Sequence, residues 1–282
     1  MLTTHENYDE FETLSQSELY LLNRCKKAHS YSYREGLVPA ATPDYFTKGT
    51  FVHQIQARIL RGDIVGTEGL DQLSLAVQTE QLNAQEPTVN EAVRTEVVWQ
   101  LTDFWNDVGI PSLDNVVAVE EEVYADLNWT DATKTTVLFH GFIDGVVRDD
   151  EGNLWIVEHK TAARAWSQNQ FEFSYQGKLY AEAWERLTGE RPMGIQYNFF
   201  YPKRWEIKLQ YVTEQESTLL LDEIQQSITL RDVMREADLA PREPKWGCGD
   251  CRYRNLCFAE LVGLDANYLR ETEFKVDEKR MR

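Results

Sequence analysis

The spacing of apolar residues changes along the chain and divides it into helical and extended stretches. Between residues 14 and 108 apolar residues recur at helical spacing, as at Phe51, Ile55 and Ile59, with a break near Pro87. From residue 116 onward apolar and polar positions begin to alternate, which is typical of strands. The pattern predicts helices over 14–27, 48–60, 68–108, 169–187 and 214–237. It predicts strands over 116–127, 135–148, 154–158, 194–201 and 205–212, and a compact loop over 248–257 followed by a charged tail.

These strands fill the middle of the chain, with helices before, between and after them, which indicates an α/β or α+β protein. No stretch rich in Gly, Pro or Ser separates two parts of the sequence. We therefore expect a single domain over residues 1–282.

Composition and charge narrow the functional classes. The 282 residues are 42% hydrophobic and 12% aromatic, which is enough for a core and excludes general disorder. The apolar runs are too short to span a bilayer and the first ten residues contain no apolar signal region, so we expect a cytoplasmic protein without membrane contact. The net charge of −18 argues against a protein that coats nucleic acid nonspecifically, but not against an enzyme that cuts DNA with a carboxylate-bound metal.

Two carboxylates and a lysine are the central candidates for chemistry. Glu158 and Lys160 point to the same side of their strand, directly after the apolar run 154–157. Asp144 lies on the preceding strand, and a turn at 149–153 can bring it beside Glu158. Carboxylate oxygens suit Mg²⁺, and a lysine can stabilise charge on a phosphate or position a water molecule. A structural ion pair between Glu158 and Lys160 is the alternative.

Three further residues are candidates for the same site. His53 lies on a predicted helix, where a neutral imidazole is a good additional metal ligand, although a lone helical histidine is more often simply packed or exposed. Gln176 and Tyr180 are four residues apart on another predicted helix, so they share one face. Such a pair can contact substrate or orient Lys160, or it can be an ordinary half-exposed helix surface.

The four cysteines favour a metal site over a disulfide scaffold. Cys248, Cys251 and Cys257 lie within ten residues, and the spacing of the first two is typical of metal ligands. The remaining cysteine is Cys25, near the opposite end of the chain, so coordination by all four thiolates would join the two ends. Four thiolates suit a [4Fe–4S] cluster or Zn²⁺, and the spacing does not choose between them.

The order and spacing of these residues resemble the RecB-type branch of the PD-(D/E)XK nuclease superfamily. Its iron–sulfur subgroup includes CRISPR-associated RecB-like exonucleases, AddB-type helicase-nucleases and phage exonucleases. The motifs that carry the resemblance are Gly49-Thr50-x-x-His53, Gly141-x-x-Asp144, Glu158-x-Lys160, Gln176-x-x-x-Tyr180 and the four cysteines. Glu120 resembles a further acid of the family, although the adjacent Glu121 and Glu122 compete for that position.

The resemblance implies a restriction-endonuclease-like core, a mixed sheet flanked by helices, over about residues 45–212. It implies a Mg²⁺- or Mn²⁺-dependent DNA exonuclease that hydrolyses phosphodiester bonds at DNA ends, in recombination, repair or phage DNA processing. The implied metal ligands are His53, Asp144 and Glu158. Lys160 would assist the attacking water, and Gln176 and Tyr180 would contact substrate or support the site.

The resemblance also implies a structural [4Fe–4S] cluster, with Zn²⁺ as the alternative. Cys25, Cys248, Cys251 and Cys257 would bind it and join the segments 14–30 and 241–262. The implied partners are single- or double-stranded DNA ends and a recombination or single-strand-annealing protein. Candidate DNA contacts, from composition alone, are Lys203, Arg204, Trp205, Lys245, Arg252 and Arg254.

Two alternative functions stay open at this point. A CRISPR-adaptation nuclease that trims spacer precursors would use the same residues. A non-catalytic iron–sulfur or zinc module that binds a partner protein is a different class, and the complete set of two acids and a lysine argues against it. A nonspecific single-strand binder is disfavoured by the net charge of −18 and by the lack of a long basic and aromatic stripe.

Overall fold

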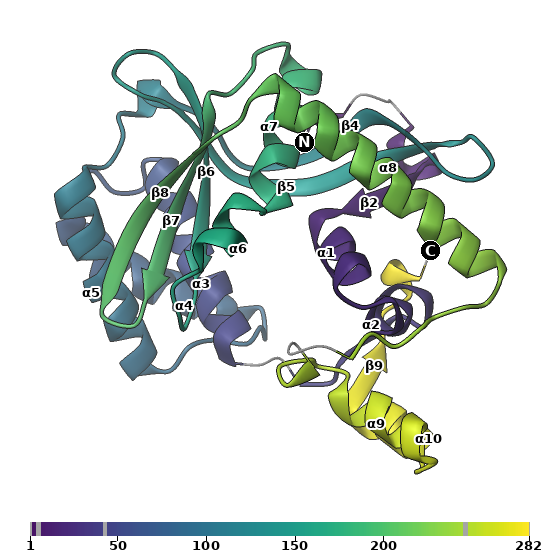
Figure 1. Cartoon of the computed structure of the whole chain (residues 1–282). Helices are drawn as coiled ribbons and strands as arrows, with labels where there is room; N and C mark the ends of the chain where they lie inside the picture. The colour runs from purple at the N-terminus through teal and green to yellow at the C-terminus, as the bar shows by residue number, and fades with distance from the viewer. Residues whose placement is uncertain (1, 4–6, 42–43, 245–247, 282) are drawn as a thin grey trace. The chain divides into compact units, whose positions relative to one another are not determined.

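The computed structural model of the chain describes residues 2–3, 7–41, 44–244 and 248–281 and divides into two compact units (Figure 1). The first unit consists of residues 1–8, 43–127 and 139–219, and the second of residues 9–42, 128–138 and 220–282. The expected core over about residues 45–212 falls in the first unit, apart from the segment 128–138. That the whole chain acts as one nuclease domain stays a prediction.

The first unit is built on a mixed sheet. Its strands, in spatial order, are β1 (Leu2–Thr3), β4 (Val116–Thr130), β5 (Thr136–Arg148), β6 (Leu154–Thr161), β7 (Gly194–Tyr201) and β8 (Arg204–Tyr211). Strand β6 is antiparallel to β5 and parallel to β7, and β7 is antiparallel to β8. The ends of β4 and β5 that meet at residues 128–138 belong to the second unit. The α/β class and the mixed central sheet expected from the sequence are confirmed.

Three helices precede the main strands and share an apolar core. They are α3 (Asp44–Leu60), α4 (Leu70–Asn83) and α5 (Glu91–Val108), so the predicted break near Pro87 separates α4 from α5. Their buried faces meet each other and the ring of Phe200 on β7. This core fixes α3, and with it His53, relative to the sheet.

Helices cover both faces of this sheet. After β6 the chain forms the short helix α6 (Gln168–Glu172) and then α7 (Tyr175–Thr188). Gln56 of α3 contacts His159, whereas Gln176 of α7 contacts Glu158. Because neighbouring residues of a strand point to opposite faces, α3 and α7 lie on opposite faces of β6. Strand β6 therefore presents polar side chains toward both helices.

The second unit contains more regular structure than its sequence predicts. The segment predicted as one helix over 14–27 follows a short strand, β2 (Glu12–Ser15), and divides into α1 (Gln16–Arg24) and α2 (Lys26–His29), because Cys25 between them is extended. The chain continues through a π-helical turn (Ser30–Arg34), and α8 (Glu214–Glu236) lies mostly in this unit.

The prediction of a charged tail is wrong. The C-terminal residues form α9 (Arg254–Val262), α10 (Ala266–Glu273) and β9 (Phe274–Val276), which pairs antiparallel with β3 (Leu37–Pro39). Tyr253, Leu256 and Phe274 are buried against the N-terminal Tyr31. This burial stabilises elements whose charged surroundings conceal them in the sequence. Cys257 consequently lies on a helix and not in a loop.

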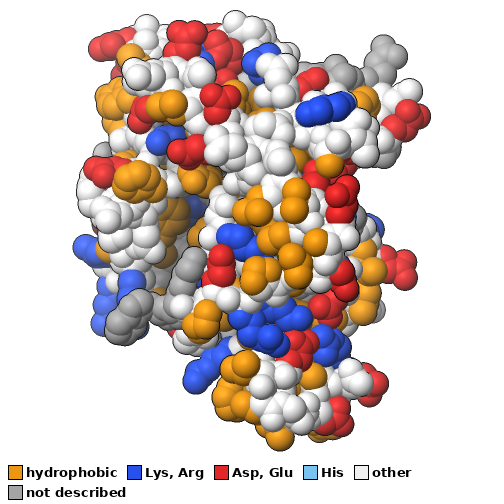
Figure 2. All heavy atoms as spheres, turned by 45° about the vertical axis from the view of Figure 1, so that its right-hand side comes forward, with side chains coloured by type: hydrophobic (Ala, Val, Ile, Leu, Met, Phe, Trp, Pro, Cys, Tyr) orange, Lys and Arg blue, Asp and Glu red, His pale blue; other side chains and the backbone are white. Residues whose placement is uncertain are grey.

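Two surface properties bear on partners. Among the described residues, no helix is long and apolar enough to cross a membrane. On the face drawn in Figure 2, the described Lys and Arg side chains form small groups with acidic side chains among them, without an unbroken basic stripe. A nucleic acid on this face would therefore meet basic side chains only at separate small groups.

Candidate active site

The two predicted carboxylates lie next to each other on neighbouring strands. Gly145 of β5 pairs with Val157 of β6, so Asp144 and Glu158 are the next residues on the two strands. Both side chains are buried, with 6% and 2% of their surface exposed. Asp144 Oδ2 accepts a hydrogen bond from the backbone N–H of His159 at 2.7 Å, which fixes the carboxylate beside β6. The hairpin thus brings the acids together as the sequence predicts.

Lys160 is held by two oxygen acceptors. Its Nζ donates to Glu158 Oε1 and to Gln176 Oε1, both at 2.6 Å. Gln176 Nε2 in turn donates to Glu158 Oε1 at 2.7 Å and lies 3.2 Å from the Tyr180 hydroxyl. The four side chains form one connected network between β6 and α7, so the predicted pair on α7 reaches the predicted pair on β6.

Two glycines allow α7 to approach the sheet this closely. A Cβ at Gly177 would lie 2.6 Å from atoms of Ile195 and Tyr197, and the Gly177 N–H donates to the Tyr197 hydroxyl at 3.1 Å. A Cβ at Gly141 would lie 2.7 Å from the ring of Tyr180. A glycine is therefore needed at position 141 of the segment Gly141-x-x-Asp144, because a side chain there would clash with Tyr180.

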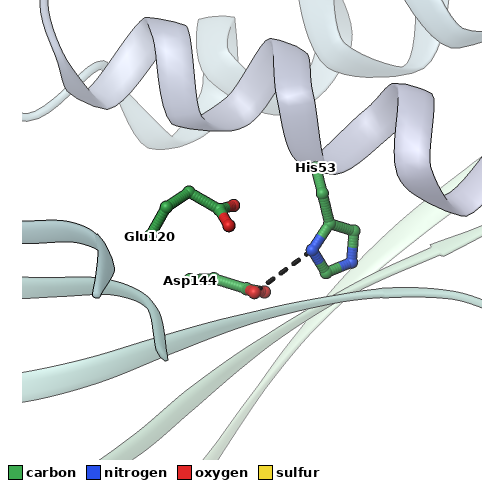
Figure 3. A group of neighbouring side chains, drawn as sticks. All are labelled: His53, Glu120 and Asp144. Atoms are coloured by element: carbon green, nitrogen blue, oxygen red, sulfur yellow. Dashed lines mark hydrogen bonds and ion pairs between the residues drawn. The ribbon is translucent and has the colours of Figure 1, made fainter. Parts of the chain in front are cut away.

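His53, Glu120 and Asp144 form a group of potential metal ligands (Figure 3). One ligand atom from each lies within 4.8 Å of the other two, and His53 Nδ1 is 3.1 Å from Asp144 Oδ1. Glu120 has a left-handed backbone conformation, with φ of 50°. Such a residue in a strand marks a local irregularity that redirects the side chain. The signal that separates Glu120 from Glu121 is thus its backbone, which the sequence pattern does not contain.

Burial and the closeness of three carboxylates shift the pKa values of the site residues. Burial and then the charge of Asp144 raise the pKa of Glu158 to about 7. Burial and Asp144 likewise raise the pKa of Glu120. Burial would also raise the pKa of Asp144, but the hydrogen bond and charge of His53 outweigh it and lower that pKa. Burial would lower the pKa of His53, but Asp144 raises it to about 9. A cation at this position would relieve the repulsion among the three acids.

The residues fit a divalent metal. Glu158 Oε2 is buried and makes no hydrogen bond within the described chain, although its partner oxygen accepts two. An unpaired buried carboxylate oxygen is costly unless a cation or donor meets it. Carboxylate oxygens together with one imidazole nitrogen are suitable ligands for Mg²⁺ or Mn²⁺. Glu158 does not belong to the compact group of three, where Glu120 stands instead.

The four cysteines all lie in the second unit, and three of them pack against its core. Burial raises the pKa of the Cys251 thiol, and the neighbouring thiols of Cys25 and Cys248 raise it further. Among the described residues, the cysteine sulfurs do not form a group of three or more potential metal ligands that all lie within 4.8 Å of one another. A tetrahedral zinc site needs sulfurs about 3.8 Å apart, as Zn–S bonds of about 2.3 Å require. The thiols are therefore neighbours but do not form such a compact cluster.

The candidate DNA contacts on β8 are partly engaged in the fold. The indole N–H of Trp205 donates to Asp103 at 2.8 Å, and its ring packs against Phe104. The Arg204 guanidinium lies 4.8 Å from the centre of the Tyr201 ring. Lys245 lies outside the described residues. Trp205 thus has a structural role in the first unit that composition alone does not indicate.

Comparisons with known proteins are consistent with this geometry. A family model described as the PD-(D/E)XK nuclease superfamily matches residues 13–258, an interval that contains every candidate residue above. The crystal structure of a "Putative exonuclease" from Eubacterium rectale matches with a TM-score of 0.52 at 14% identity, over 90% of this chain and 93% of that chain. The crystal structure of SSO0001 matches with a TM-score of 0.37 at 14% identity, over 86% of this chain and 95% of that chain. No curated protein sequence matches the chain.

Proposed function

Because the chain belongs to the PD-(D/E)XK nuclease superfamily, we propose that it is a Mg²⁺- or Mn²⁺-dependent deoxyribonuclease that hydrolyses phosphodiester bonds at DNA ends. The observation that carries the proposal is the meeting of Asp144, Glu158 and Lys160, on the central strands β5 and β6, with His53 of α3. Recombination, repair or phage DNA processing are the settings that this activity serves.

The metal would be held by His53, Glu120 and Asp144, and the unpaired Oε2 of Glu158 would be a further oxygen whose charge it could offset. When bound, it supplies positive charge that polarises the phosphate and stabilises the charge that develops during hydrolysis. Asp144 is oriented for this role by the His159 backbone N–H. His53 orients the other oxygen of Asp144, Oδ1.

Lys160 would act on the water or the phosphate. A lysine ammonium has three N–H groups, and Glu158 and Gln176 take two of them. The third can donate to a phosphate oxygen or to the attacking water. Gln176 and Tyr180 are positioning residues in this scheme, because Gln176 contacts both Lys160 and Glu158 and Tyr180 supports Gln176.

An exonuclease is preferred to an endonuclease because a protein of the same fold is named as a putative exonuclease. A non-catalytic module has no use for two buried acids and a half-buried lysine held between two acceptors. We further propose that Cys25, Cys248, Cys251 and Cys257 bind a structural [4Fe–4S] cluster, for which thiolates are the suitable ligands. The proposed partners are DNA ends and a recombination or single-strand-annealing protein.

The direct test uses end-labelled single- and double-stranded DNA with Mg²⁺, Mn²⁺ or EDTA, and reads the products by length. The parent should shorten DNA from an end only with metal. Asp144→Ala, Glu158→Ala and Lys160→Ala should each abolish cleavage while circular dichroism and melting stay near those of the parent. Lys178→Ala is the matched control. Lys178 also lies on α7, but it contacts the Glu172 carbonyl and the Glu216 carboxylate and not the candidate site. Full activity of Glu158→Ala would refute the assignment.

A further inference from the structure

A cavity of about 990 Å³ opens beside the candidate metal site in the first unit. It lies between α3 and α4, and His53, Glu120 and Lys160 form its edge toward the metal site. Cavities of this size hold ligands as large as a nucleotide. Two further residues of its wall, His159 and Arg61, have no assigned role.

The hydrogen bonds of His159 determine which of its ring nitrogens carries the proton. The indole N–H of Trp105 can only donate, and it donates to Gln56 Oε1 at 2.8 Å. The amide of Gln56 is thereby oriented with its NH₂ group toward His159 Nδ1, at 3.4 Å. Asn198 Nδ2 approaches the same nitrogen, also at 3.4 Å. Nδ1 is therefore an acceptor, and the neutral ring carries its proton on Nε2.

This Nε2–H is an unused donor. The His159 side chain is 1% exposed, and Nε2 makes no hydrogen bond within the described chain. A buried donor without a partner is destabilising, and His159 lines the cavity, so a ligand or water in the cavity would be its acceptor. In this tautomer Nε2 cannot bind a metal, because its lone pair is occupied by the proton. The missing partner is thus an acceptor such as an oxygen.

Arg61 adds a positive charge to the same cavity. It follows the last residue of α3, is exposed, and its side chain makes no ion pair or hydrogen bond with another described residue. Arg58, one turn earlier, is instead neutralised by Asp63 and Glu80. The charge of Arg61 acts on Glu120, which places it close to the candidate metal site. Glu80, Glu86 and Glu120 also line the cavity, but Glu80 is paired with Arg58. A guanidinium without an ion pair and an N–H donor in one cavity suit an anionic oxygen ligand.

We propose that this cavity binds a phosphate group of the DNA strand next to the scissile phosphate, with Arg61 and His159 as the donors. The inference rests on the proposed nuclease function and adds to it a subsite that holds the strand beyond the metal. Because α3 and α4 form walls of the cavity, a phosphate bound there would determine how far the end of the DNA strand extends past the metal site.

Binding can be measured apart from cleavage in EDTA, where no metal is present. Calorimetry should show that the parent binds dAMP more tightly than deoxyadenosine, since only dAMP carries a phosphate. Arg61→Gln should weaken dAMP binding roughly tenfold, because a charge-assisted contact is lost. Arg148→Gln is the matched control, since Arg148 is paired with Glu190 and does not line the cavity. His159→Asn, checked for folding by circular dichroism, should weaken dAMP binding as well.

A labelled single-stranded decanucleotide in EDTA separates strand binding from free-nucleotide binding. It should bind the Arg61→Gln variant more weakly than the parent, and dAMP should compete with it. Unchanged dAMP affinity in Arg61→Gln would overturn the subsite, even if the parent cleaves DNA with Mg²⁺. Weakened dAMP binding with unchanged decanucleotide binding would overturn the assignment to the strand. A parent that shows the phosphate-dependent binding but never cleaves would refute the nuclease function alone.

Discussion

His53 Nδ1 lies 3.1 Å from Asp144 Oδ1, and this contact joins α3 to β5 across 91 residues of sequence. Because the Asp144 carboxylate also accepts the His159 backbone N–H, its two oxygens are fixed from two sides. Without the histidine, Asp144 would face Glu120 and Glu158 with one positive neighbour fewer. The contact therefore makes the position of an acid on the sheet depend on the packing of a helix.

His53→Ala should raise the Mg²⁺ concentration needed for half-maximal cleavage by about tenfold or more, because a ligand and the orientation of Asp144 are lost together. The measurement is a metal titration of the cleavage rate. His140→Ala is the matched control, since His140 lies on the same strand as Asp144 but bonds Glu122. Superimposable titration curves for His53→Ala and the parent would show that His53 is merely packed.

Glu120→Gly should separate metal binding from stability. The positive φ of Glu120 costs an ordinary residue about 1–2 kcal/mol, and glycine avoids that cost. The variant should therefore melt no lower than the parent while it needs more Mg²⁺ or loses cleavage. Glu121→Gly, at a neighbouring strand position without the positive φ, should lose stability instead. A Glu120→Gly protein with parental metal dependence would remove Glu120 from the site.

The sequence predicts the parts of the site whose geometry is local. Alternation along one strand places Glu158 and Lys160 on one side, and helical spacing places Gln176 beside Tyr180. Glu120 was not separable from its acidic neighbours, because its left-handed backbone is imposed by the sheet and not by residue type. The tautomer of His159 depends on Trp105 through Gln56, a chain of contacts between distant segments. Such contacts exist only after the helices pack, so no local pattern contains them.

The same distinction explains the C-terminal error. The segment after Cys257 ends in the highly charged residues 270–282, and this composition conceals the helical spacing of Phe258, Leu261 and Val262. Its burial against Tyr31 comes from the N-terminal part of the second unit. Tertiary packing therefore stabilises the C-terminal elements, whereas the predicted strands carry their own alternating signal.

Glu158→Gln should change how stability depends on pH in the absence of metal. The folded pKa of Glu158 is about 7, above the usual 4.5 of the unfolded chain, so its contribution to stability is lost as pH rises from about 4.5 to 7. In EDTA the melting temperature of Glu158→Gln minus that of the parent should increase between pH 5 and pH 8. A constant difference over that range would show that Glu158 is ionised throughout. Glu158→Gln should also lack the rise in melting temperature that Mg²⁺ gives the parent.

Cys25 is distant in sequence from the other three cysteines but lies in the same unit. It occupies the extended break between α1 and α2 and packs against the same small core as Cys251 and Cys257. Burial, and to a smaller extent the thiols of Cys25 and Cys248, raise the pKa of Cys251, and a bound metal would instead favour the thiolates that coordinate it. A metal that joins Cys25 to the other three cysteines closes a long loop. It can stabilise the folded protein strongly, because loop-closure entropy grows with loop length.

Protein purified without air should therefore be brown and contain iron, and Cys25→Ser should lose as much iron and melting temperature as Cys251→Ser. Cleavage should fall in Cys25→Ser only where the protein is unfolded, because the acids and Lys160 belong to the first unit. Metal analysis and thermal melting, measured on both variants and the parent, decide the matter. A colourless protein with one zinc per chain would retain four-thiolate binding and exclude the iron–sulfur cluster. Unchanged metal content and melting in Cys25→Ser would show that the first cysteine is not a ligand, since losing one of four thiolates must weaken any metal they share.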